Sequence, residues 1–256
     1  MKRVRVIPVL LLAENGMVKT QRFSKPRYLG DPINAVKIFN DKQVDELILL
    51  DIEATAKGCV DFDWVEDIVS EAFMPIAYGG GITSLDQCVE LFTRGVEKFI
   101  VNTSACERPQ LISEAAERFG SQAVVVSIDA RRNWWKQSRA YIRGGGRATR
   151  HPPVDLARRA EELGAGEIFL TAVDREGTFG GYDLSILRSV SDAVSLPVIA
   201  NGGAGSLEHL RQAVAEGGAS AVAAGSMFVF AAKGEGVLIN YPAESELEER
   251  VWTRLY

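Results

Sequence analysis

The feature that most constrains this chain is a strict alternation of short apolar runs with amphipathic helical patterns. Eight apolar runs have strand length: Val4–Leu12, Leu47–Ile52, Pro75–Tyr78, Phe99–Asn102, Ala123–Ile128, Ile168–Thr171, Pro197–Ala200 and Ala219–Ala224. Helical spacing of apolar residues recurs between them, at Ile33–Lys42, Leu85–Arg94, Gln110–Phe119, Pro153–Leu163 and Leu207–Glu216. Such alternation requires a parallel sheet, and eight units in 256 residues favour closure into a (β/α)8 barrel, or TIM barrel.

The second half of the chain repeats the first. The stretch that begins at Pro75 aligns without a gap with the stretch that begins at Pro197, 122 residues later. A period of about half the chain is too long for a solenoid and fits a barrel of two similar halves. We therefore predict one α/β domain over residues 1–256, built from half-barrels at about 1–122 and 123–256.

Composition and charge exclude several classes of protein. The net charge is −5, which argues against a general nucleic-acid surface. Three dispersed cysteines (Cys59, Cys88 and Cys106) indicate buried thiols in a reducing compartment, and two histidines (His151 and His209) are too few for a multi-histidine metal site. The apolar N-terminal run is too short to span a bilayer. We expect a cytoplasmic protein that uses no metal or organic cofactor and binds neither membrane nor nucleic acid.

A glycine pair follows the strand in each copy of the repeat, and a serine that can cap the next helix follows the pair. The glycines are Gly80, Gly81, Gly202 and Gly203, and the serines are Ser84 and Ser206. The next strand of each half ends in Asn102-Thr103 or Gly225-Ser226. Glycine lets backbone N–H groups approach an anion, although a tight turn alone also explains one such pair. Two symmetric copies favour two phosphate cradles, with the loop 174–178, which contains Asp174 and Gly177, beside the second.

A basic segment, 131–150, follows the fifth predicted strand and contains no acidic residue. It carries Arg131, Arg132, Trp134, Trp135, Lys136, Arg139, Arg143, Arg147 and Arg150. One hypothesis is a mobile flap that clamps an anionic ligand and stacks on a ring. The alternative is a solvated basic hairpin. Together with the two cradles, the segment indicates a small ligand with a phosphate at each end, or a diphosphate-bearing sugar.

The chain resembles the cyclase subunit of imidazole glycerol phosphate synthase, the HisF family, along nearly its whole length. The matching stretches include "GDPINAVKIFNDKQVDELILLDI", "YGGGI", "NTSA", "FGSQAVVVSIDA", "GAGEIFLTAVDREGT", "GGYD" and "PVIANGGAGSLEH". The resemblance implies that a HisH-like glutaminase docks on the N-terminal face of the barrel and sends ammonia through the core. It also implies one phosphate site at Gly80, Gly81, Asn102 and Thr103, another at Gly177, Gly202, Gly203 and Ser226, and a ligand contact at Lys19. A charged ammonia gate would be formed by Arg5, Glu46, Lys98 and Glu167; the alternative is a purely structural layer of salt bridges.

One departure from the family concerns the chemistry. The family's reaction uses an aspartate at the end of strand one and another at the end of strand five, and Asp129 matches only the second. Leu11, or Leu12 if the nearby indel is placed differently, stands at the first position, and leucine cannot transfer a proton. Glu14 is a candidate replacement on the adjacent loop. The last strand departs as well, since the family usually has a histidine near Val229, and the chain then ends its barrel with the stretch 236–242. In these respects the chain is similar to the WbuZ-like paralogues found with surface-polysaccharide genes.

Three functions follow as hypotheses. The first is an ammonia-accepting synthase subunit that works with the glutaminase, and with a third amidotransferase-type enzyme, in amidation of a phosphorylated or nucleotide-activated sugar. The second is a true cyclase of histidine biosynthesis, acting on phosphoribulosyl formimino-aminoimidazole carboxamide ribotide. The third is a non-catalytic barrel that activates the glutaminase. An ammonium-driven assay with the histidine-pathway substrate discriminates the first from the second.

Overall fold

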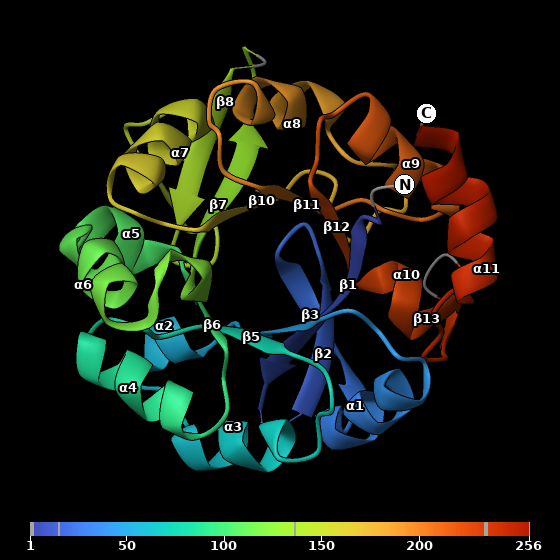
Figure 1. Cartoon of the computed structure of the whole chain (residues 1–256), viewed down its shortest axis with the longest axis horizontal. Helices are drawn as coiled ribbons and strands as arrows, with labels where there is room; N and C mark the ends of the chain where they lie inside the picture. The colour runs from blue at the N-terminus through green and yellow to red at the C-terminus, as the bar shows by residue number, and fades with distance from the viewer. Residues whose placement is uncertain (1–2, 15, 136, 233–234, 256) are drawn as a thin grey trace.

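Eight parallel strands close into a ring in the computed structural model, which describes residues 3–14, 16–135, 137–232 and 235–255 (Figure 1). In ring order these strands are β1 (Arg5–Ala13), β4 (Leu47–Asp51), β5 (Ile76–Gly79), β6 (Lys98–Val101), β7 (Val124–Arg132), β10 (Glu167–Ala172), β11 (Val198–Asn201) and β12 (Ala221–Ala224). Each pairs in parallel with the next, and β12 pairs with β1 to close the barrel. The predicted (β/α)8 barrel is confirmed.

Helices surround the strands (Figure 1). The longer ones are α1 (Pro32–Asp41), α3 (Phe62–Val69), α4 (Leu85–Thr93), α6 (Gln110–Phe119), α7 (Pro153–Glu162), α8 (Leu184–Ser191) and α9 (Leu207–Ala215). Short helices are α2 (Ala54–Lys57), α5 (Thr103–Glu107), α10 (Ser226–Val229) and α11 (Glu244–Leu247), with a π-helical turn at Glu248–Trp252 and 3-10 turns at Ser121–Ala123 and Thr253–Leu255. Ser84 and Ser206 cap α4 and α9 by accepting a backbone N–H three residues on, which fixes where these helices begin. None of the helices in the described ranges has the length and apolar character needed to cross a membrane.

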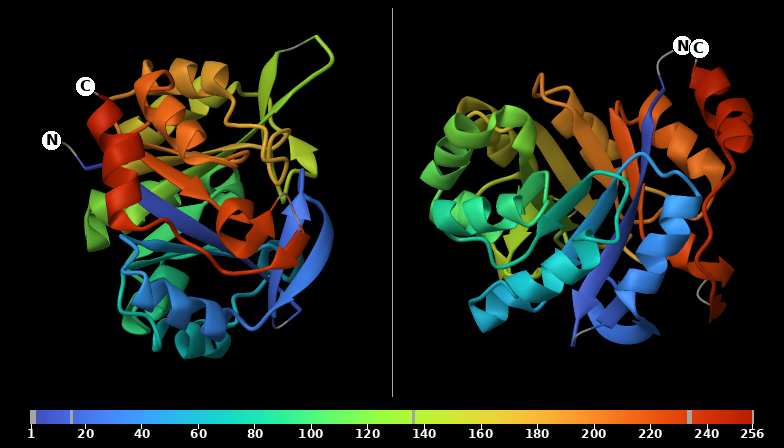
Figure 2. Two further views of the ribbon diagram at one scale, coloured as in Figure 1. Left: turned by 90° about the vertical axis from the view of Figure 1, so that its right-hand side faces the viewer. Right: turned by 60° about the horizontal axis from the view of Figure 1, so that its bottom comes forward.

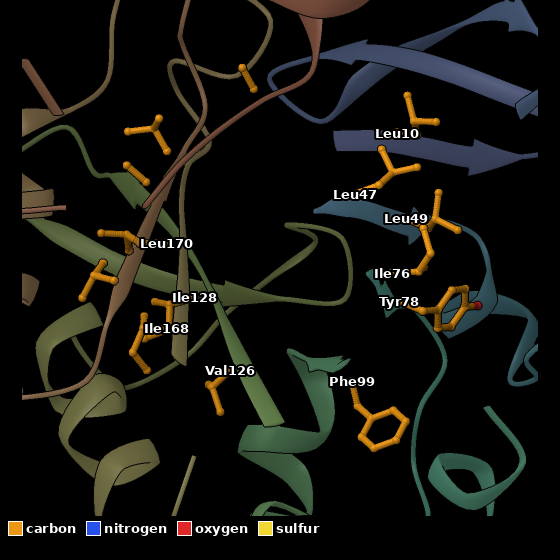
Figure 3. Packing of buried hydrophobic residues seen from close by; sticks show 14 of the residues in the cluster. Leu10, Leu47, Leu49, Ile76, Tyr78, Phe99, Val126, Ile128, Ile168 and Leu170 are labelled. Atoms are coloured by element: carbon orange, nitrogen blue, oxygen red, sulfur yellow. The ribbon is translucent and has the colours of Figure 1, made fainter. Parts of the chain in front are cut away.

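Alternate residues of each strand enter two separate apolar layers. Outward-facing side chains, such as Leu10 and Leu47, pack against the helices and form the larger core (Figure 3). Inward-facing side chains, such as Ile7 and Phe169, fill the barrel. This alternation resolves the ambiguity on strand one: Leu11 belongs to the inner layer and Leu12 to the outer one.

The first strand of each half continues into an antiparallel hairpin. In the first hairpin, β1 pairs with β2 (Gly16–Gln21), which pairs with β3 (Ser24–Gly30). In the second hairpin, β7 pairs with β8 (Ser138–Ile142), which pairs with β9 (Arg147–Ala148). Both hairpins lie at the end of the barrel opposite the N-terminus (Figure 2, left). A further antiparallel pair, β13 (Phe230–Ala232) and β14 (Glu235–Val237), follows α10 and forms a separate two-stranded sheet.

The basic segment 131–150 is therefore a folded hairpin. Trp134 and Trp135 are 79% and 64% exposed and stack on each other, with ring centroids 3.8 Å apart. Neither lines the cavity described below, so the structure does not support the hypothesis that they stack on a ligand ring. Lys136 lies outside the described residues.

Candidate active site

The carboxyl ends of the strands and the two hairpins enclose a cavity of about 550 Å3. Eleven of the twelve predicted catalytic and substrate-binding residues line it: Lys19, Gly80, Gly81, Asn102, Thr103, Asp129, Gly177, Gly202, Gly203, Gly225 and Ser226. Asp174 is not among the lining residues. Its carboxylate instead accepts the backbone N–H of Arg132 at 2.9 Å and lies 3.6 Å from Arg131, at the base of the second hairpin. Both glycine turns thus open into one cavity.

The first cradle is the set Gly80, Gly81, Asn102 and Thr103. Gly80 has a φ of 133°, and a Cβ there would lie 2.4 Å from the carbonyl oxygen of Asp51, so the turn excludes a side chain. The amide of Asn102 donates to the carbonyl oxygen of Ser127 at 3.0 Å, which fixes the end of β6 against β7. The Oγ1 atom of Thr103 accepts the backbone N–H of Arg143 at 3.1 Å. The second hairpin is therefore anchored on this cradle.

The second cradle is the set Gly177, Gly202, Gly203, Gly225 and Ser226. A Cβ at Gly203, which has a φ of 112°, would lie 2.2 Å from the carbonyl oxygen of Gly181. At Gly225 a Cβ would lie 2.6 Å from the Nζ atom of Lys19. The second cradle thus has backbone exposed to the cavity and an ammonium group beside it.

A buried ion pair holds the first hairpin over the second cradle. The Nζ atom of Lys19 lies 2.9 Å from a carboxylate oxygen of Glu176, and both side chains are buried. Glu176 also accepts from the hydroxyl of Thr20 and the backbone N–H of Phe23, each at 3.2 Å. Because Phe23 lies against the second hairpin at Gly145, the two hairpins meet over the mouth of the cavity. Glu176 was not predicted, since only the folded chain brings it to Lys19.

Asp129 is the predicted acid/base, and it lies near the end of β7 with its carboxylate buried. Burial raises the pKa of this carboxyl group to about 7, an effect that the Ser127 hydroxyl, 3.5 Å away, and the charge of Arg131 only partly offset. A carboxyl group with a pKa near neutrality can both give and take a proton at physiological pH. Asp129 is therefore chemically suited to general acid–base catalysis.

The position of the missing aspartate is apolar. Leu11 is 7% exposed, lines the cavity and packs in the inner layer with Val9 and Val18. Of the described residues, the carboxylates that line the cavity are Asp51, Glu107, Asp129 and Glu176. Glu14 is exposed and lies outside this set, so the structure does not bring it in as a replacement.

Asp51 does not fill the position either. It pairs in register with Leu12, while Leu11 pairs with Leu50, so the pleat places Asp51 on the opposite face of the sheet from Leu11. One of its oxygens accepts the backbone N–H groups of Glu53 and Ala54, both at 2.9 Å, at the start of α2. Burial raises the pKa of Asp51 as well. This carboxyl group beside the first cradle was not predicted from the sequence.

The four predicted gate residues meet at the amino ends of the strands. Arg5 contacts both Glu46 and Glu167, and the Nζ atom of Lys98 lies 3.0 Å from Glu46 and 2.9 Å from Glu167. The two carboxylates are 3% and 11% exposed, and alternating charges form a closed ring. Between this ring and the cavity lie the apolar side chains of the inner layer.

The raised pKa of Asp129 leads to a prediction about stability. Because its folded pKa of about 7 exceeds the ordinary value of 3.8, the native state holds a proton that the unfolded chain releases between these pH values. The free energy of unfolding therefore falls as the pH rises from about 4 to about 7. The full cost of burying the ionisable group is present above pH 7 and is absent below about pH 4. We expect Asp129→Asn to raise the free energy of unfolding at pH 8 by about 2–4 kcal/mol and to leave it unchanged near pH 4. Urea unfolding at both pH values measures this; an equal effect at both would contradict a raised pKa.

The fold and cavity define a (β/α)8 barrel with its candidate site at the carboxyl ends of the strands, where enzymes of this fold bind their substrates. A family model described as "Histidine biosynthesis protein" matches residues 5–233. The chain belongs to this family, and relatives that are 40–46% identical to it identify its branch as the HisF family.

Relatives in several bacteria match along nearly their whole length. The chain is 46% identical over 249 residues to the Pseudomonas aeruginosa protein named "Putative imidazole glycerol phosphate synthase subunit hisF2", a match that covers 97% of this chain and 99% of the relative. A HisF-named protein of Leptospira borgpetersenii is 46% identical over 252 residues, or 97% and 98% of the two chains. The hisF3-named protein of Vibrio vulnificus is 40% identical over 248 residues, or 96% and 95%.

Proposed function

We propose that this chain is the ammonia-accepting subunit of a glutamine amidotransferase that adds nitrogen to a phosphorylated or nucleotide-activated sugar for a surface polysaccharide. This role corresponds to the WbuZ-like branch of the family. The observation that carries the proposal is the cavity itself: it keeps both glycine cradles but has Leu11, in an apolar surrounding, where the family's reaction uses a second acid.

In the proposed reaction the two cradles fix the long axis of the ligand, and ammonia reaches its electrophilic carbon from the barrel core. The C–N bond forms at a carboxyl or acetamido carbon of the sugar as the C–O bond of that group breaks, and the oxygen leaves as water. Asp129, the buried carboxyl group in the cavity, protonates the departing oxygen and takes a proton from the new ammonium group. One acid/base suffices for this exchange, whereas closing an imidazole ring needs proton transfer at two places.

A HisH-like glutaminase on the N-terminal face is the proposed ammonia source, and the ring of Arg5, Glu46, Lys98 and Glu167 is the proposed gate. Lys98→Met leaves two buried carboxylates without one of their cations, so we expect stability to fall by about 2–4 kcal/mol. We also expect glutamine-driven turnover to fall at least tenfold more than ammonium-driven turnover. Arg211→Met, which removes a paired cation from the outer surface of α9, is the control. If turnover falls equally with both nitrogen sources, the ring is a purely structural layer of salt bridges.

The test of the proposed function is nitrogen transfer in a reconstituted system. The barrel, its glutaminase and the third, amidotransferase-type enzyme are incubated with amide-15N glutamine and nucleotide-activated amino sugars, and the products are analysed by mass spectrometry. We expect 15N in the sugar, and its loss when Asp129 is replaced by Asn. Full incorporation without a functional Asp129 would instead support a scaffold that only activates the glutaminase.

A second candidate is the cyclase of imidazole glycerol phosphate synthase. The names of the relatives favour it, since they denote subunits of that enzyme. The strand-one position argues against this candidate. Asp129 lines the cavity, but Leu11 contributes only an apolar side chain where the cyclase reaction uses a second acid.

A further inference from the structure

The cations that line the cavity are unequally divided between its two ends. Among the described residues they are Lys19, Arg108 and Arg143. Lys19 lies beside the second cradle and is committed to the buried carboxylate of Glu176. Both arginines lie beside the first cradle: Arg143 is anchored through its N–H on Thr103, and Arg108 directly follows α5, which begins at Thr103. One end of the cavity thus carries two guanidinium groups beyond its backbone cradle.

The backbone holds both arginines at this rim. The Arg108 guanidinium donates to the carbonyl oxygen of Thr83, in the turn that follows the first glycine pair, at 3.0 Å. The chain around Arg143 is part of the second hairpin, and the amide of Asn102 also donates to the carbonyl oxygen of Tyr141 there at 3.3 Å. Neither arginine can leave the rim without a rearrangement of these backbone contacts.

The present partners of the two guanidinium groups are easily exchanged. Arg143 pairs with Glu107 at 3.0 Å, and Arg108 pairs with Glu114 at 2.7 Å. The four side chains are between 36% and 56% exposed, and ion pairs so exposed contribute little to stability. A phosphoryl group carries more negative charge than a carboxylate and also accepts bidentate hydrogen bonds from arginine. Exchange of carboxylate for phosphate is therefore favourable.

From this arrangement we propose that Arg108 and Arg143 extend the first cradle into a diphosphate subsite. The cradle backbone binds one phosphoryl group, and the two guanidinium groups bind the next one along the ligand. The second cradle binds a single phosphoryl group or a neutral sugar. This inference rests on the proposed function and narrows it to substrates whose first-cradle end carries a diphosphate, as nucleoside-diphosphate sugars do.

Binding of inorganic pyrophosphate and of orthophosphate to the full chain, measured by isothermal titration calorimetry, tests the proposal. We expect pyrophosphate to bind at least about tenfold more tightly than orthophosphate. Arg143→Gln and Arg108→Gln should each weaken pyrophosphate binding about tenfold or more, because each removes a charge-assisted contact, while orthophosphate binding changes less than about threefold. Glu107→Gln should tighten pyrophosphate binding several-fold, since it releases Arg143 from its competitor.

Two control variants separate the subsite from a general effect of charge. Arg188→Gln removes an equally exposed, acid-paired arginine on α8, outside the cavity lining, and should leave both affinities unchanged. Ser226→Ala, in the second cradle, should leave the tight binding of pyrophosphate at the first cradle unchanged. The proposal is overturned if Arg143→Gln and Arg108→Gln act no more strongly than Arg188→Gln, or if they weaken both anions equally. Because no ammonia, glutaminase or turnover enters this measurement, its outcome is independent of whether sugar amidation itself is demonstrated.

Discussion

Replacement of Asp129 by Asn is expected to lower ammonium-driven turnover by about 10²–10⁴-fold, the usual contribution of a general acid or base. Asparagine has nearly the same shape and retains one carbonyl oxygen for the Ser127 hydroxyl, but it cannot exchange a proton. The Michaelis constant should change little, because the cradles that bind the phosphates are untouched. Turnover measured with saturating ammonium chloride isolates this step from the glutaminase.

The stability of the same variant makes the result easier to interpret. Since Asp129→Asn is expected to be more stable at pH 8, a loss of turnover there cannot be ascribed to unfolding. Ser127→Ala is a matched control that removes the hydroxyl beside the carboxylate but keeps the carboxyl group. It should reduce turnover by less than about tenfold. Equal losses of turnover for the Asp129→Asn and Ser127→Ala variants would contradict a proton-transfer role for Asp129.

Replacement of Leu11 by Asp is expected to create imidazole-forming activity, raising it at least about 10²-fold above the level of the unmodified chain. The substitution places a carboxyl group on the inner face of β1, in the cavity that already contains Asp129. Burial among apolar side chains, together with the like charge of Asp129, will raise the pKa of the new group. A second acid near neutral pH then becomes available at the position where the family's reaction uses one.

This gain has a cost in stability of about 2–5 kcal/mol, because a large buried apolar side chain is lost and a polar one is introduced. Leu11→Asn is the matched control, with a similar loss of packing and no titratable proton. The measurement is release of imidazole glycerol phosphate with ammonium as the nitrogen source. A folded Leu11→Asp protein that is no faster than Leu11→Asn would show that the missing carboxyl group does not limit this reaction.

The barrel could be predicted because its signals are local and repeated: eight apolar runs, helical spacing between them and a repeat at half the chain length. Element ends were less predictable. The apolar run predicted to end at Ile128 continues to Arg132 as β7, because pairing with β8 extends the ladder into polar residues. An apolar sequence pattern indicates burial, whereas the end of β7 is held in the sheet by its hydrogen bonds to β8.

The glycine turns could be predicted because glycine pairs at strand ends have a local conformational cause. The side chains around them could not. Glu176 reaches the first hairpin across 156 residues of sequence, and an isolated glutamate in a loop gives no sign of that partner. Arg108 likewise follows a short helix that no apolar pattern marks. Asp174 and the tryptophan pair show the converse, since residues near a site in sequence need not line it.

The most direct test of the central claim is to give the unmodified chain, with ammonium chloride, the histidine-pathway substrate that carries a phosphate at each end. Because the cavity has two cradles but no acid on strand one, we predict that this ligand binds in the cavity but is converted slowly. Its turnover should be at least 10²-fold below the turnover numbers of ordinary enzymes, which are about 1–10³ s⁻¹. Conversion at ordinary enzymatic rates would contradict the account and make the chain a cyclase of histidine biosynthesis.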